Sequence, residues 1–152
     1  FLNVAGIRSP GLTSAPAIAD YAAELLAADG LDLTEKDSYI DSREKVHFNR
    51  LSAAERKALI EKNPAYGRVI CRCETVTEGE ILDAIHSPIP PVSVDGIKRR
   101  TGAGMGRCQG GFCGPRVVDL LARELGVSPL TILQDRDGSE ILTSYTKGEV
   151  RA

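Results

Sequence analysis

The four cysteines of this 152-residue chain are grouped in two short motifs, and this grouping limits the chemistry more than any other feature. Cys71 and Cys73 form a C-x-C pair, and Cys108 and Cys113 form a C-x4-C pair. Thiolate sulfur is the donor that zinc, Cu(I) and iron–sulfur clusters prefer, and two such pairs can converge on one centre. The sequence therefore predicts a four-thiolate metal site.

Disulfide bonds are the least favoured alternative for these cysteines. A bridge within the C-x-C pair would be strained, because its two residues lie too close along the chain. Bridges between the two motifs would suit a secreted protein, but nothing in the sequence marks secretion. We expect disulfides only in an oxidised, metal-free protein.

Composition limits which fold classes and which kinds of partner we expect. Tryptophan is absent and aromatic residues make up 5% of the chain, which favours a mainly α domain over a β-sandwich. The formal charge of −2 gives no electrostatic reason to expect nucleic acid or an anionic membrane as a partner. No apolar run has transmembrane length, so we expect no transmembrane segment.

Composition shifts along the chain predict four parts. The chain opens on Phe1 with FLNVAG, which resembles the middle of a strand, so we expect the C-terminal part of a larger protein. The expected parts are the end of a larger domain (1–30), a polar linker with a short helix (31–65), a small helical metal domain (66–137) and a tail (138–152).

Two helix starts and a strand are expected in the first half. Apolar residues around a glycine predict a strand over 1–8, and Ser14 is a plausible N-cap for a helix with Pro16 in its first turn. Gly30 would end this helix. Ser52 and Glu55 have capping-box spacing and predict a helix over 52–62.

Further helices are expected around the cysteines. A capping box from Thr77 to Glu80 opens one helix, and Ser93 or Asp95 could cap a second that runs to about residue 101. An apolar stripe predicts a third helix over 115–125, with Gly126 at its end. Ser128 and Pro129 predict one more short helix.

The surroundings of the cysteines suit negatively charged sulfur. Two glycines in the C-x4-C loop let backbone N–H groups approach the sulfurs, and Cys113 directly precedes a helix N-terminus. The stretch from 96 to 118 has no acidic residue but five cations, namely Lys98, Arg99, Arg100, Arg107 and Arg116. A zinc–tetrathiolate site would also suit such a shell. The C-x-C spacing, less usual for zinc, favours an iron–sulfur cluster and leaves zinc as the alternative.

These motifs resemble a known family. The segments CRCE (71–74), TEGEI (77–81), IKRRT (97–101) and GMGRCQGGFC (104–113) resemble the bacterioferritin-associated-ferredoxin-like [2Fe–2S] domains over about residues 66–135. The resemblance implies a small all-helical fold in which loops near the surface hold the cluster. It implies that Cys71, Cys73, Cys108 and Cys113 are the ligands.

The first thirty residues resemble the final strand–loop–helix of FAD-dependent dehydrogenases of the D-amino-acid-oxidase superfamily, most closely the glycerol-3-phosphate type. In that family the loop and the helix N-terminus lie against the flavin. The alternative is a buried strand with a packed helix and no cofactor contact. The resemblance implies FAD contacts in the full-length protein for seven residues: Gly6, Ile7, Ser9, Gly11, Leu12, Thr13 and Ser14.

Together the two resemblances imply an electron-transfer region that passes electrons from FAD through a [2Fe–2S] cluster. The expected partners are the rest of the flavin domain and an electron-acceptor protein or subunit. Lys98, Arg99 and Arg100 could form a docking patch for an acidic partner, and a solvated helix face is the alternative for this run. We expect the protein in the cytoplasm or, through a partner, at the inner face of the membrane. The chain alone lacks a G-x-G-x-x-G fingerprint and is expected to be inactive. A non-catalytic zinc- or cluster-binding docking module is the alternative.

Overall fold

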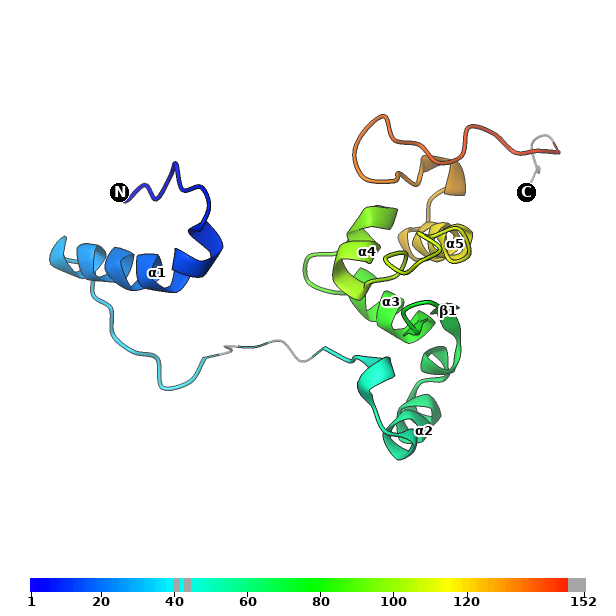
Figure 1. The fold of residues 1–152 in the computed structure, drawn as a ribbon, viewed down its shortest axis with the longest axis horizontal. Helices are drawn as coiled ribbons and strands as arrows, with labels where there is room; N and C mark the ends of the chain where they lie inside the picture. Colours follow the sequence, from blue (N-terminus) through cyan, green and yellow to red (C-terminus); the bar gives the residue numbers. More distant parts are fainter. Residues whose placement is uncertain (40–41, 43–44, 148–152) are drawn as a thin grey trace. The chain divides into compact units, whose positions relative to one another are not determined.

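The computed structural model describes residues 1–39, 42 and 45–147, and it divides the chain into two compact units, Phe1–Arg43 and Glu44–Ala152. The described residues form five α-helices, three short 3₁₀-helices and one two-stranded sheet (Figure 1). This confirms the predicted mainly α fold. The predicted linker and tail lie partly outside the described residues, at 40–41 and 43–44 and at 148–152.

The first unit is built around α1 (Gly11–Ala28). The prediction of Ser14 as N-cap is wrong, because the Ser14 N–H already donates to the Pro10 carbonyl at 3.1 Å within the first turn. Pro16 consequently lies inside the helix. The C-terminal stop is confirmed, since Gly30 follows the helix with φ +90°.

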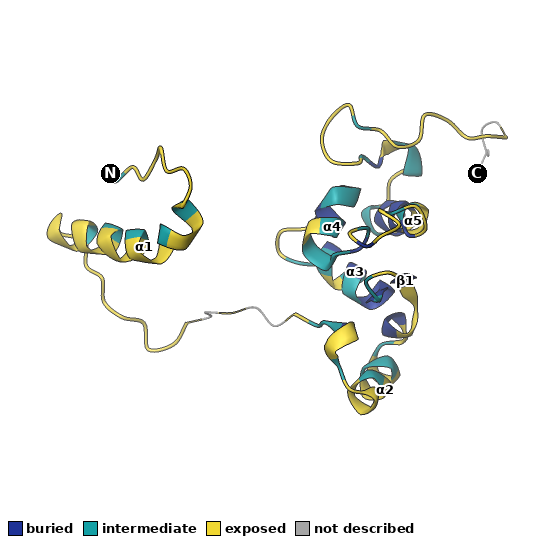
Figure 2. Cartoon of the chain, in the orientation of Figure 1, coloured by how far each residue is buried: buried dark blue, intermediate teal, exposed yellow. Residues whose placement is uncertain are grey.

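The predicted strand over 1–8 is not found, because the described part of this unit offers no second strand for its hydrogen bonds. None of the residues of α1 is buried (Figure 2), and Leu12 and Tyr21 are 91% and 62% exposed. Apolar side chains of this helix are therefore uncovered in the described chain. Among the described residues, no helix has the length and apolar character needed to cross a membrane.

The second unit contains the hydrophobic core. Strands β1 (Val69–Cys71) and β2 (Val76–Thr77) pair antiparallel. Helices α3 (Glu78–Ile85), α4 (Val94–Thr101) and α5 (Gly114–Leu125) follow, and α2 (Ala53–Lys62) precedes the sheet. The 3₁₀-helices are η1 (Phe48–Arg50), η2 (Pro64–Gly67) and η3 (Pro129–Thr131). Figure 2 shows the buried residues gathered on β1 and on α3 to α5. The core cluster is Ile70, Cys71, Val76, Ile81, Ile85, Ile97, Ala103, Cys113, Val117, Val118, Leu120, Leu121, Ala122 and Ile132.

The helix starts follow the predicted side-chain caps. Ser52 with Glu55 opens α2, and Thr77 with Glu80 opens α3, each as a complete capping box. The hydroxyl of Ser93 accepts from the Gly96 N–H at 3.1 Å and caps α4. These short polar contacts satisfy N–H groups that have no partner within their own helix. They fix where α2, α3 and α4 begin, whereas α5 starts at Cys113 without a side-chain cap.

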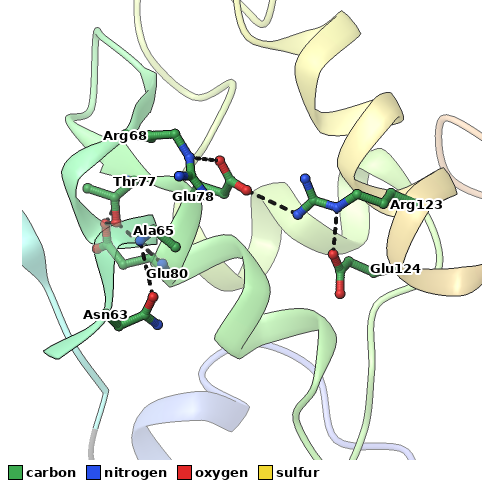
Figure 3. Close-up of polar contacts among 8 residues, drawn as sticks. All are labelled: Asn63, Ala65, Arg68, Thr77, Glu78, Glu80, Arg123 and Glu124. Carbon is green, nitrogen blue, oxygen red and sulfur yellow. Dashed lines mark hydrogen bonds and ion pairs between the residues drawn. The ribbon is translucent and has the colours of Figure 1, made fainter. Parts of the chain in front are cut away.

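The carboxylate of Glu78 connects the start of α3 with two arginines from other elements (Figure 3). Its oxygens accept from Arg68 Nε at 2.5 Å and from Arg123 Nη2 at 3.0 Å. Glu78 is only 5% exposed, so this charge depends on its partners. The hydrogen bond from Arg68 is the main reason that the pKa of Glu78 is lowered, and Arg123 adds to the effect.

Glu78→Gln should destabilise the fold and make its stability less sensitive to acid. The lowered folded-state pKa means that the charge stabilises the protein above the ordinary pKa of 4.5 and loses this effect as pH falls through the folded value. We expect a loss of about 2 kcal/mol in the free energy of unfolding at neutral pH. Urea unfolding of both proteins at a series of pH values measures this.

Glu61→Gln is the matched control, because Glu61 is 67% exposed and lies 3.9 Å from Lys57 in a pair that water screens. It should leave both the free energy of unfolding and its pH dependence close to those of the native chain. Identical acid sensitivity in the native chain and in Glu78→Gln would contradict the role of Glu78.

Candidate metal centre

The C-x-C pair lies where β1 turns into β2. Cys71 is the last residue of β1, is 1% exposed and pairs in register with Val76. Cys73 lies in the following turn and is exposed, and Thr75 completes the turn with φ +54°. The two cysteines of this pair do not lie on one extended segment, because the chain reverses directly after Cys71. The turn directs one cysteine into the core and leaves the other at the surface.

The C-x4-C pair lies in the loop between α4 and α5. Cys113 is 1% exposed and is the N-cap residue of α5, as its position in the sequence predicted, whereas Cys108 is exposed. Gly110 has φ +82° and its carbonyl accepts from the Gly114 N–H at 2.7 Å, which closes the loop onto the helix. This motif also has one buried and one surface cysteine.

The structure brings the two motifs together through pairs that combine one cysteine from each. The pKa of Cys108 is lowered by the backbone N–H of Phe112 and then by the thiol of Cys73 beside it. Burial, followed by the neighbouring Cys71, raises the pKa of Cys113 to about 11. Cys108 also acts on Cys113, so the four sulfurs form one connected set.

This set consists of an exposed pair, Cys73 with Cys108, and a buried pair, Cys71 with Cys113. Within the described residues, no three or more His, Cys, Asp or Glu side chains are grouped so that they could hold one metal ion. Two neighbouring pairs of cysteines would suit a centre with two metal atoms, in which each metal atom takes two protein ligands.

A close backbone approach fixes the exposed pair. A Cβ placed on Gly106 would lie 2.2 Å from Cys73 Cβ and 3.3 Å from its sulfur. Real Cβ atoms do not come that close. Only glycine at position 106 therefore lets this loop contact the C-x-C turn in this way. Gly104 differs, because an added Cβ there would lie 3.8 Å from Gly110 Cα, at ordinary van der Waals distance.

The cations beside the cysteine motifs differ in part from the predicted shell. Arg99 pairs with Asp135 at 2.6 Å, and Arg100 donates to the Ile89 carbonyl at 2.8 Å. The guanidinium of Arg116 lies over the ring of Phe112.

Arg72 completes this group, and the sequence reasoning missed it. Its guanidinium also lies over the Phe112 ring, and with Arg107, Cys73 and Glu74 it lines a hollow of about 380 Å³. Its place in the sequence between Cys71 and Cys73 could have identified it as a neighbour of the site.

The residues predicted to contact flavin lie in the first unit. Ile7, Ser9, Gly11, Leu12 and Thr13 line one open hollow of about 750 Å³ around the start of α1. The other two, Gly6 and Ser14, do not line it. The structure thus brings five of the seven predicted residues around one concave surface.

The sequence is similar to several known proteins. The chain is 50% identical over 99% of its length to a glycerol 3-phosphate dehydrogenase of Caloramator mitchellensis, of which it covers 32%. It is 38% identical over 55% of its length to the hydrogen cyanide synthase subunit HcnB of Pseudomonas aeruginosa, covering 20%. It is 36% identical over 43% of its length to one subunit of the anaerobic glycerol-3-phosphate dehydrogenase of Escherichia coli K12, covering 12%.

The chain thus spans about a third of the length of the first relative and a fifth or less of the other two. No solved structure matches it significantly. Residues 69–123, which include all four cysteines, match the BFD-like [2Fe-2S] binding domain. This segment is therefore similar to the BFD-like [2Fe-2S] binding domain, in a chain that is similar over 99% of its length to a glycerol 3-phosphate dehydrogenase.

Proposed function

We propose that Cys71, Cys73, Cys108 and Cys113 hold one [2Fe–2S] cluster, and that the chain is the electron-transfer region of an FAD-dependent dehydrogenase of the glycerol-3-phosphate type. The single observation that carries this proposal is that the two cysteine motifs lie against each other, with Gly106 packed on Cys73, inside a segment that matches the BFD-like [2Fe-2S] binding domain. The two mixed pairs support two irons, because each iron of such a cluster takes two protein ligands.

The residues around the sulfurs suit a negatively charged centre. The N–H of Phe112 points to Cys108, and Cys113 lies at the N-terminus of the twelve-residue helix α5, whose dipole stabilises negative charge. Arg72 and Arg116 add positive charge nearby. The buried Cys113 thiol has a raised pKa, so metal binding there must displace a proton. When bound, the cluster would supply one-electron transfer.

The remaining parts of the proposal concern the longer protein. Its flavin would take two electrons from substrate as hydride, with glycerol 3-phosphate as the proposed substrate. The hollow lined by Ile7, Ser9 and Gly11 to Thr13 would contact FAD, and other parts of the flavin domain would cover the exposed apolar residues of α1. A separate acceptor protein or subunit would receive the electrons, in the cytoplasm or at the inner membrane face.

Anaerobic reconstitution with iron and sulfide should load about two irons and two sulfides per chain, as a [2Fe–2S] site requires. The protein should be brown and should bleach with dithionite. Replacing any one of the four cysteines by alanine should abolish stable loading, because one of the two irons would lose one of its two protein ligands. Iron and acid-labile sulfide assays with visible spectra measure this.

An alanine replacement at Ser87, which lies outside the site, provides the control: Ser87→Ala should load as the native chain does. A freshly prepared anaerobic protein with stoichiometric zinc and no sulfide would instead support the zinc-binding docking module and defeat the electron-transfer proposal.

Gly106→Ala tests the backbone contact at Cys73. The added methyl would lie 2.2 Å from Cys73 Cβ, so either the turn or the loop must move. Overpacking of this kind costs about 1–3 kcal/mol, and the strain should fall on the exposed pair of ligands. We expect a lower iron content after reconstitution and faster loss of the visible spectrum.

Gly114→Ala is the matched control. Gly114 also neighbours a ligand, but a Cβ there would meet open space in the described structure. Equal iron contents in Gly106→Ala and Gly114→Ala would show that the close approach to Cys73 does not position this ligand.

A further inference from the structure

The ring of Phe112 connects the two cysteine motifs on the surface. The guanidinium carbon of Arg72, from the C-x-C motif, lies 4.5 Å from the ring centroid. That of Arg116, from the first turn of α5, lies 5.1 Å away. Both distances are within the range of cation–π attraction. Phe112 itself comes from the C-x4-C motif, so the Arg72 contact spans the gap between the two ligand segments.

One side of the C-x4-C loop is loosely packed, although Gln109 Nε2 donates to the carbonyls of Met105 and Gly106. An added Cβ on Gly110 would meet nothing within 4 Å among the described residues. Gly104, Gly110, Gly111 and Gly114 line a hollow of about 420 Å³ rather than a packed interface. Because packing does not fill this side of the loop, contacts on its other side have more influence on its position.

Exposure shows why the position of this loop matters. Cys73 and Cys108 are the exposed cysteines, and Phe112 is 43% exposed beside them. Phe112 is not a member of the buried core cluster, so core packing does not account for its place. Two arginines contact this large apolar ring at the surface.

We propose that Arg72, Phe112 and Arg116 form a clamp that retains the cluster by holding the C-x-C turn against the C-x4-C loop. This inference rests on the proposed function, since it assumes that the four cysteines bind a cluster. Arg72 and Phe112 are positioning residues: they act through the ligands beside them in the sequence. Opening the clamp would separate Cys73 from Cys108 and expose the cluster to chelators.

The test compares rates of cluster loss in the reconstituted full chain, under argon with EDTA, followed by visible absorbance. Each exposed cation–π contact corresponds to about a two- to five-fold change in an equilibrium constant. Arg72→Gln should therefore speed loss about two- to five-fold, and Phe112→Leu, which removes both contacts, by about five- to twenty-fold. Phe112→Tyr keeps an aromatic face and should restore the native rate.

Two arginine controls separate a clamp from a general effect of charge. Arg116→Gln breaks a contact within one segment, so it should speed loss less than Arg72→Gln does. Arg99→Gln removes a cation that pairs with Asp135 and should leave the rate unchanged. The midpoint potential should fall in Arg72→Gln, because a nearby positive charge is lost, and should move less in Phe112→Leu, where both arginines remain.

The outcomes are distinguishable. A native chain that assembles no cluster would overturn the four-cysteine proposal. A native chain with a stable cluster, whose loss is no faster in Arg72→Gln and Phe112→Leu, would overturn the clamp alone. A fall in the thermal stability of metal-free Phe112→Leu that matches its faster cluster loss would also overturn it, because Phe112 would then belong to the fold.

Discussion

The hydrophobic core carries two of the four sulfurs, and the rest of the site depends on this. Cys71 and Cys113 are each 1% exposed and pack among the isoleucines, valines and leucines of β1 and α3 to α5. A free cysteine behaves as a small apolar residue, so these two positions cost the core little in the absence of metal. Cys71 and Cys113 bring two motifs that are distant in the sequence together in the same core. The other two cysteines need only short connections to reach the surface above them.

Those connections are tight turns with few packed side chains. A reversal after β1 presents Cys73, and a glycine-rich loop presents Cys108, where Gly106 makes direct backbone contact with the turn. The polar framework beneath is more firmly tied, since Glu78 joins α3 to Arg68 before β1 and to Arg123 on α5. The domain thus combines a firmly held core with more loosely supported turns that carry Cys73 and Cys108. Retention of a cluster would depend on these turns.

Local signals in the sequence predicted much of this fold. The capping boxes at Ser52 and Thr77, and Gly126 at the end of α5, are set by contacts within a few residues, so their chemistry is visible in the sequence. The prediction failed where a longer-range partner decides the outcome. Residues 1–8 have strand composition, but no strand lies beside them in the described unit. Ser14 is not the N-cap, because its backbone N–H donates to the Pro10 carbonyl inside the helix.

The site shows the same limit. The sequence indicated which four residues could bind metal, but not that they pair across the motifs, because that depends on the β1–β2 reversal and on the position of α5. Arg72 was overlooked for the same reason: its contact with Phe112 joins segments far apart in the sequence. Since the buried sulfurs are already positioned by the core, cluster binding has to organise mainly the exposed pair. Contacts such as this one, at the surface and between motifs, are therefore where the chain can adjust how long a cluster is held.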